Sequence, residues 1–244
     1  MLFDIFVVSI EVSWLSNGAF DVTVGPLVDL WGFGPEKHEG TPDDAAITKA
    51  LAEVGFDRIE LDMAEHKLKK NAELRIDLSA VAKGYGVDAV ALWLESLGST
   101  DYLVEIGGEM RSAGLSPRGD QWRIGVESPD LEADKTTPIL LGNIGVATSG
   151  DYRNYFEENG VRYSHTIDPR TGRPITHNLA SVTVLDPSCA FADAMATAFS
   201  VLGGDKTMEL AEQLDIAVYL IEKTENGFSS RYSSSFAPYL EQEK

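Results

Sequence analysis

The stretch Ala190-Phe-Ala-Asp-Ala-Met-Ala-Thr-Ala-Phe-Ser-Val-Leu202 separates two groups of strand-forming segments and decides the fold class. Its apolar residues recur at steps of three and four, which predicts a helix with one apolar face. Residues 101–186 before it are strand-like and broken by turn residues, and residues 216–232 after it predict two strands around a turn at 225–227. Runs of strands separated by grouped helices predict an α+β fold, with antiparallel strands and flanking helices.

The rest of the chain adds more helices and short strands. Apolar residues at helical spacing predict a first helix over residues 2–16, which a Ser-Asn-Gly stop signal ends. Pro42-Asp43-Asp44 begins a second helix, and Asp205 is expected to cap another. The remaining expected elements are helices over 43–54, 80–97 and 205–214, and strands over 58–62 and 74–77. We interpret residues 1–244 as one domain.

Composition narrows the functional classes. The 244 residues carry a formal net charge of −19, which argues against a nucleic-acid-binding protein. An anionic ligand would have to be attracted locally, by backbone N–H groups or by a metal ion. The single cysteine excludes a disulfide scaffold, and the four histidines lack zinc-site spacing. The sequence shows neither an apolar run long enough for a membrane helix nor a signal peptide.

A segment rich in glycine, proline and aromatic residues runs from Asn17 to Pro35. It contains Ala19, Phe20 and Asp21, followed by Val-Thr-Val-Gly-Pro. Such a composition predicts a rigid loop that can close on a flat ring. A turn that carries core aromatic residues would have the same composition.

The segment Asp77-Leu-Ser-Ala-Val-Ala-Lys-Gly-Tyr85 joins a predicted strand to a predicted helix. Ser79 can cap this helix, and the N-terminus of a helix offers unbonded N–H groups to a phosphate. Lys83 adds a mobile cation suited to a diphosphate. An ordinary capped helix with a surface lysine would have the same pattern, which is not the phosphate-binding loop of ATPases.

The third segment comprises Gly145–Tyr152 and Tyr163–Pro174. Its second part places His165, Asp168 and two arginines within nine residues, around an Asp-Pro-Arg-Thr-Gly turn. Histidine is the side chain best suited to proton transfer near neutral pH, so His165 is a candidate general base or acid. A structural histidine remains the alternative.

The fourth segment contains Asp193 and Thr197, which lie at i and i+4 and so share one face of the predicted helix. Alternating alanines leave space around them. A carboxylate and a hydroxyl are hard oxygen ligands that suit Mg²⁺. The alternative is an N-cap aspartate with a threonine bonded back to its own helix.

The order and content of these segments resemble the ApbE family of FAD:protein FMN transferases over nearly the whole chain. The resemblance also includes Tyr102-Leu-Val-Glu-Ile-Gly-Gly-Glu109. It implies a T-fold-like α+β unit that binds FAD and Mg²⁺, transfers FMN to a threonine hydroxyl of an acceptor protein through a phosphoester bond, and releases AMP. The implied acceptors include subunits of sodium-pumping NADH:quinone oxidoreductases.

The resemblance also assigns roles to residues of this chain. It places metal ligands at the Asp193 carboxylate, the Thr197 hydroxyl and two backbone carbonyls. It places FAD contacts in the other segments and makes His165 and Asp168 the catalytic candidates. The carbonyl ligands are those of Ala80 and Ala196, and the FAD contacts are Ala19, Phe20, Asp21, Asp77, Lys83 and Ile167.

Two alternatives share this site: an FAD pyrophosphatase that forms FMN and AMP, and an inactive flavin-binding protein. Family members usually carry an export signal and roughly 80 to 100 residues before the segment that begins here at Gly18. The chain is therefore expected to be N-terminally short, and family analogy gives a periplasmic or membrane-associated location. The sequence does not determine the oligomeric state.

Overall fold

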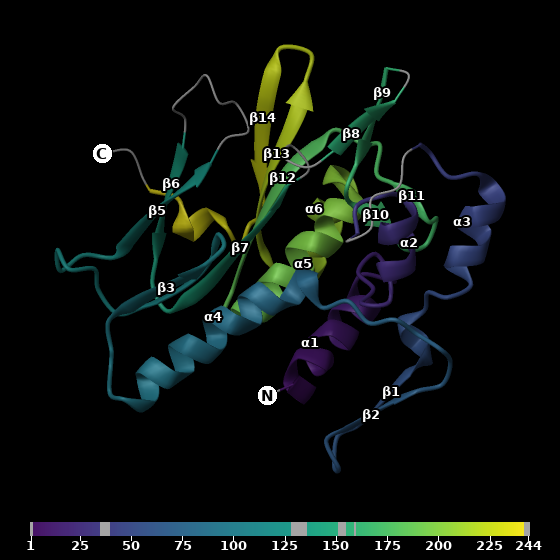
Figure 1. Cartoon of the computed structure of the whole chain (residues 1–244). Coiled ribbons are helices and arrows are strands. Elements are labelled where there is room, and N and C mark those ends of the chain that lie inside the picture. Colours follow the sequence, from purple (N-terminus) through teal and green to yellow (C-terminus); the bar gives the residue numbers. More distant parts are fainter. Residues whose placement is uncertain (1, 35–39, 128–135, 151–154, 159, 242–244) are drawn as a thin grey trace.

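A six-stranded antiparallel sheet forms the centre of the computed structural model, which describes residues 2–34, 40–127, 136–150, 155–158 and 160–241 (Figure 1). Neighbouring strands pair antiparallel throughout, which confirms the predicted fold class. In spatial order, the strands are β14 (Gly227–Tyr232), β13 (Ala217–Thr224), β12 (Leu179–Asp186), β7 (Ile144–Gly150), β4 (Glu109–Ala113) and β3 (Tyr102–Ile106).

Both faces of this sheet are covered, because successive side chains of a strand point to opposite faces. In β13, Val218 and Leu220 join the larger hydrophobic core on the helical side. Tyr219 and Ile221 join a second core on the other side. Strand β13 therefore contributes to a hydrophobic core on each face of the sheet.

The helical face carries α5 (Cys189–Leu202), with α4 (Ser79–Ser96) packed beside it. Figure 1 shows α4 and α5 crossing the sheet, with α1 (Leu2–Leu15) next to them. Helix α6 (Gly204–Leu214) follows α5 and also packs against it. Because α5 is surrounded in this way, Asp193 is 5% exposed.

The opposite face is covered by a hairpin of β5 (Trp122–Glu127) and β6 (Thr136–Leu141), together with the 3₁₀ turn Ala237–Tyr239. Phe236, just before this turn, is fully buried.

Smaller elements lie outside the six-stranded sheet and its long helices. They are α2 (Gly25–Leu30), α3 (Asp44–Leu51), the 3₁₀ turn Phe56–Arg58, and the antiparallel pairs β1 (Ile59–Asp62) with β2 (Lys67–Lys70), β8 (Tyr155–Glu158) with β9 (Val161–Ser164), and β10 (Ile167–Asp168) with β11 (Arg173–Pro174). Over the part of the chain that the structure describes, every helix is too short or too polar to span a bilayer.

Some local predictions were wrong. Residues 74–77 form no strand, whereas Lys67–Lys70 form one that was not predicted and that pairs with β1. The loop expected after Asp21 contains α2, which Pro26 begins by fixing a helical φ. The second helix ends at Leu51 rather than near 54.

Two predicted caps were also wrong. The N-cap of α6 is Gly203, and Asp205 instead pairs with Arg231 at 2.9 Å. The N-cap of α4 is Leu78, which lies one residue before Ser79 and provides no side-chain cap.

Candidate functional site

A cavity of about 770 Å³ opens beside the N-terminal half of α4 and the middle of α5. Its volume lies within the usual range for a small-molecule or cofactor site. The cavity brings together most of the residues that the sequence singled out, although they come from distant parts of the chain. Those that line it are Ala19, Phe20, Asp21, Asp77, Ala80, Lys83, His165, Ile167, Asp193 and Thr197; Asp168 and Ala196 do not.

The two helices of the site approach closely at Gly84. A Cβ atom added there would lie 2.3 Å from the carbonyl oxygen of Cys189 and 2.8 Å from Cβ of Asp193. This closeness lets the Gly84 N–H donate a 2.9 Å hydrogen bond to Oδ2 of Asp193. A glycine in α4 thus fixes the orientation of a carboxylate on α5.

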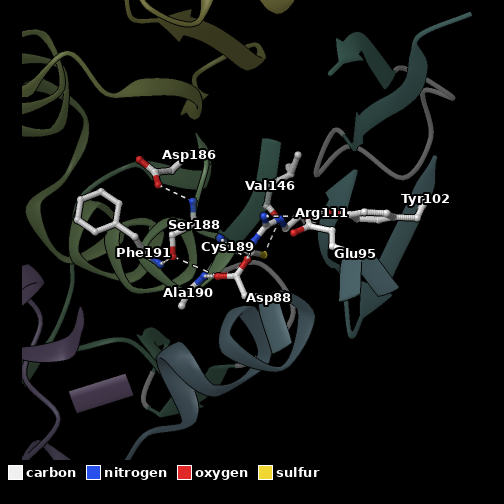
Figure 2. Close-up of polar contacts among 10 residues, drawn as sticks. All are labelled: Asp88, Glu95, Tyr102, Arg111, Val146, Asp186, Ser188, Cys189, Ala190 and Phe191. Atoms are coloured by element: carbon white, nitrogen blue, oxygen red, sulfur yellow. Dashed lines mark hydrogen bonds and ion pairs between the residues drawn. The ribbon is translucent and has the colours of Figure 1, made fainter. Parts of the chain in front are cut away.

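Asp88, one turn further along α4, holds the N-terminus of α5 (Figure 2). Its carboxylate accepts hydrogen bonds from the backbone N–H groups of Cys189 and Ala190 at 3.1 and 3.0 Å, and from the Ser188 hydroxyl at 3.1 Å. Arg111 of β4 donates to the same carboxylate at 2.9 Å. Asp88 therefore acts as an additional cap for α5 and fixes its position along α4.

Two buried carboxylates share one lysine at the cavity. Lys83 forms an ion pair with Glu109 of β4, and its Nζ lies 3.8 Å from Oδ1 of Asp193. Burial raises the pKa of Asp193, while the Gly84 hydrogen bond and the charge of Lys83 act in the opposite direction. Burial also raises the pKa of Glu109, against the hydrogen bond from Lys83. A further cation here would reduce the cost of burying these charges.

The donor atoms near Asp193 fit Mg²⁺. Oδ2 is bonded to Gly84, which leaves Oδ1 directed toward Lys83, and Thr197 lines the cavity one turn later on α5. The described ranges contain no group of three or more His, Cys, Asp or Glu side chains able to hold a metal. An ion at this position would need carbonyl, water or substrate oxygens as well, a mixture that Mg²⁺ commonly accepts.

The N-terminus of α4 is less open than the sequence predicted. The Ser79 N–H donates to Asp77 at 2.9 Å, and the N–H groups of Val81 and Ala82 bond to the Leu78 carbonyl. These amides are therefore occupied. Lys83 therefore offers an anion at this end of the cavity more positive charge than the occupied helix amides do.

The Ala19–Asp21 segment is held rigidly, as expected. The Asp21 carboxylate accepts hydrogen bonds from the Thr23 N–H at 2.7 Å, the Thr23 hydroxyl at 2.6 Å and the Phe56 N–H at 3.0 Å. Burial raises the pKa of Asp21, which these hydrogen bonds oppose. The carboxylate fixes the loop, so that the buried Phe20 forms part of the cavity wall.

The two catalytic candidates have different surroundings. His165 lines the cavity, with its ring centroid 6.3 Å from that of Phe33 at an interplanar angle of 70°. Asp168 lies outside the lining and accepts two hydrogen bonds from the Arg170 guanidinium, each 2.8 Å long. The Arg170 N–H also donates to Asp168, at 2.9 Å. These contacts make Asp168 a residue that stabilises the 168–172 turn.

Sequence reasoning missed two charged residues of the cavity wall, Asp29 of α2 and Arg75, which form an ion pair. It also gave no role to Glu109. The relevant contacts join residues far apart in the chain, so no local pattern could reveal them. Asp151 and Tyr152, part of the third segment, lie outside the described residues.

Comparison with known proteins identifies the family. The model of the ApbE family matches residues 1–220. A Haemophilus influenzae protein named FAD:protein FMN transferase is 47% identical over 239 residues, which is 96% of this chain and 69% of that protein. A Vibrio cholerae protein of the same name is 48% identical over 235 residues, 95% and 70% of the two chains.

A solved structure gives the same result. The structure titled flavin transferase ApbE from Vibrio cholerae superimposes with a TM-score of 0.88 at 46% identity and covers 97% of this chain and 76% of that one. A family match over most of the chain, close relatives and a shared fold all agree. This chain belongs to the ApbE family.

Proposed function

We propose that this protein transfers the FMN half of FAD to a threonine hydroxyl of an acceptor protein and releases AMP. The names of its relatives support flavin transfer. The observation that carries the proposal is the convergence of Asp193, Thr197 and Lys83 with His165 in one cavity.

The reaction exchanges one bond to phosphorus for another. The threonine oxygen bonds to the FMN phosphorus, the bond from that phosphorus to the bridging oxygen breaks, and AMP leaves with that oxygen. His165 would accept the hydroxyl proton. Asp193, Thr197 and the carbonyls of Ala80 and Ala196 would hold Mg²⁺, which supplies positive charge to the diphosphate.

The other residues position the substrate. Lys83 provides a second positive charge beside Asp193. Phe20 and Ile167 offer apolar wall to the flavin end, so that the phosphorus stays in line with the incoming hydroxyl. The acceptor would carry a threonine flavinylation motif, as in a subunit of a sodium-pumping NADH:quinone oxidoreductase.

The test measures AMP release from FAD, with and without Mg²⁺, in the presence of such an acceptor. We expect metal-dependent AMP together with covalent flavin fluorescence on the acceptor. Metal-dependent AMP with free FMN alone would instead indicate a pyrophosphatase. A yellow protein that releases no AMP would be an inactive flavin-binding protein.

Matched variants test the metal ligands. Thr197→Val removes the hydroxyl at nearly constant size, whereas Thr197→Ser retains it. We expect activity to survive only in the serine variant, and Asp193→Ala to abolish metal-dependent AMP release. Normal transfer by Asp193→Ala at ordinary Mg²⁺ would contradict the metal assignment.

A further inference from the structure

Lys83 lies between two carboxylates of unequal accessibility. The Glu109 side chain is 2% exposed, that of Asp193 is 7% exposed and that of Lys83 is 44% exposed. Lys83 is in direct contact with Glu109, and its distance of 3.8 Å to Asp193 is longer than a hydrogen bond. The ammonium is therefore held by Glu109 and only approaches Asp193.

The surroundings of Glu109 favour this choice of partner. One of its oxygens, Oε2, is buried without a hydrogen-bond partner among the described residues. Burying a carboxylate is costly unless a cation accompanies it, and Lys83 is the cation in contact. Gly107, at φ +62°, leaves room for the lysine stem, because a Cβ atom there would lie 3.3 Å from Cδ of Lys83.

A lysine beside a metal-binding carboxylate poses an electrostatic problem. If the ammonium paired fully with Asp193, it would compete with a divalent cation for the same oxygen and repel it. Glu109 changes this balance, because the two carboxylates and one ammonium together carry one net negative charge. Without Glu109, the remaining pair would be neutral.

We infer that Glu109 is a positioning residue that holds Lys83 off Asp193, so that Asp193 binds Mg²⁺ while Lys83 remains in the cavity. This inference rests on the proposed function. The bound ion and the lysine then both face the diphosphate. If the Lys83–Glu109 pair were merely structural, it would stabilise the fold, and loss of Glu109 would not weaken metal binding.

The experiment measures Mn²⁺ binding to the chain of residues 1–244 without FAD, from the paramagnetic resonance signal of free Mn²⁺. Mn²⁺ accepts the same oxygen ligands as Mg²⁺. Glu109→Gln is expected to weaken binding about tenfold, because Lys83 then turns to Asp193. Lys83→Met is expected to strengthen binding severalfold. Because Glu109 acts through Lys83, the double variant should bind Mn²⁺ as tightly as Lys83→Met, and two additive effects that return it to the wild-type affinity would contradict the inference.

The control is a matched ion pair elsewhere. Lys69 and Glu60 on the β1–β2 hairpin form an exposed pair at 3.2 Å, and neither lines the cavity. Glu60→Gln breaks the same kind of contact and should leave Mn²⁺ affinity unchanged. Thermal denaturation without metal establishes that each variant is folded.

The opposite effects of the two single variants, together with the loss of the Glu109→Gln effect when Lys83 is replaced, carry the inference. Unchanged affinity in Glu109→Gln would overturn it, as would a Lys83→Met chain that binds Mn²⁺ no more tightly than wild type. The Lys83→Met measurement tests the inference even if Glu109→Gln fails to fold. If the wild-type chain bound no Mn²⁺, or if Asp193→Asn bound it normally, the proposed metal site itself would be wrong.

Discussion

The backbone N–H of Gly84 on α4 donates a hydrogen bond to the Asp193 carboxylate on α5, at 2.9 Å and at a point where the two helices lie close together. The same glycine that permits the approach thus orients the proposed metal ligand. Packing and site geometry are coupled at this residue.

Gly84→Ala should therefore affect both stability and the site. The new methyl group would meet the backbone of Cys189, which cannot rotate away, so we expect a loss of about 1–3 kcal/mol or more in the free energy of unfolding. The Mg²⁺ concentration for half-maximal AMP release should rise. Urea denaturation and a Mg²⁺ titration of activity measure the two effects.

Gly86→Ala is the matched control in the same helix. A Cβ atom there would meet only the flexible end of Ile106, at 3.3 Å. Alanine is also favoured over glycine within a helix by about 1 kcal/mol. This variant should be as stable as wild type or more so, and equal losses in both variants would contradict the role given to Gly84.

Asp88→Ala should loosen α5 from its N-terminal end. The substitution removes the acceptor for Cys189, Ala190 and the Ser188 hydroxyl, and leaves Arg111 without this buried partner. Removing one member of a buried ion pair costs about 3–5 kcal/mol. We expect a loss of this size in chemical denaturation, accompanied by a rise in the Mg²⁺ concentration for half-maximal AMP release.

The longer contact of Arg111, with Glu95 at 3.4 Å, provides the comparison. The Glu95 side chain is 41% exposed, so Glu95→Gln should change the free energy of unfolding by less than about 1 kcal/mol. Similar losses in the Asp88 and Glu95 variants would show that the cap contributes little.

Asp186 predicts a pH dependence of stability. Burial raises the pKa of its carboxyl group, assisted by the charges of Asp88 and Glu11. The folded state therefore binds this proton more tightly than the unfolded state. The stability that this proton contributes is fully present below the pKa of Asp186 in the unfolded chain. It is lost as pH rises through the pKa of Asp186 in the folded chain.

Asp186→Asn should accordingly stabilise the chain at neutral pH, by a gain on the order of 1 kcal/mol. The amide oxygen can still accept the Ser188 N–H, now bonded at 2.8 Å. The advantage should shrink as pH falls through the folded pKa of Asp186. Thermal melts of variant and wild type at a series of pH values measure it.

Asp101 should show the opposite sign. The Leu115 N–H and then the Thr100 hydroxyl donate to its exposed carboxylate and lower its pKa. Its contribution is present above the unfolded pKa and is lost as pH falls through the folded pKa. Asp101→Asn should destabilise the chain at neutral pH and have no effect in acid. The same sign for both variants would contradict the assignments.

The elements predicted correctly are those whose signals are local. Helix α5 follows from its apolar spacing, and the turn before Gly227 follows from Glu-Asn-Gly. Helix α2 was missed because its six residues begin with a Gly-Pro pair, which is typical of a turn. Short segments of this kind take their structure from the surrounding packing.

The residues of the site also differ in how well the sequence predicts their proximity. Asp193 and Thr197 lie four residues apart on one helix, so their proximity could be predicted. The contact between Asp88 and Ser188 spans 100 positions, and Glu109 meets Lys83 only because β4 lies beneath α4. Such pairings depend on tertiary structure, and no periodic pattern in the sequence predicts them.

His165 provides the last prediction. If it accepts the threonine proton, His165→Ala should lower the rate of flavin transfer at saturating FAD by about 10²- to 10⁴-fold. FAD affinity, measured by the change in flavin fluorescence with Mg²⁺ absent, should stay close to wild type if the ring serves the proton transfer rather than FAD binding.

His66 is the control histidine, since it lies in the β1–β2 turn at φ 50° and outside the cavity lining. Asparagine tolerates this backbone conformation, so His66→Asn should transfer flavin at the wild-type rate. A parallel loss of FAD affinity and rate in His165→Ala would mean that His165 binds the substrate. An unchanged rate would mean that another group of the cavity accepts the proton, because removal of a general base slows the step that it serves.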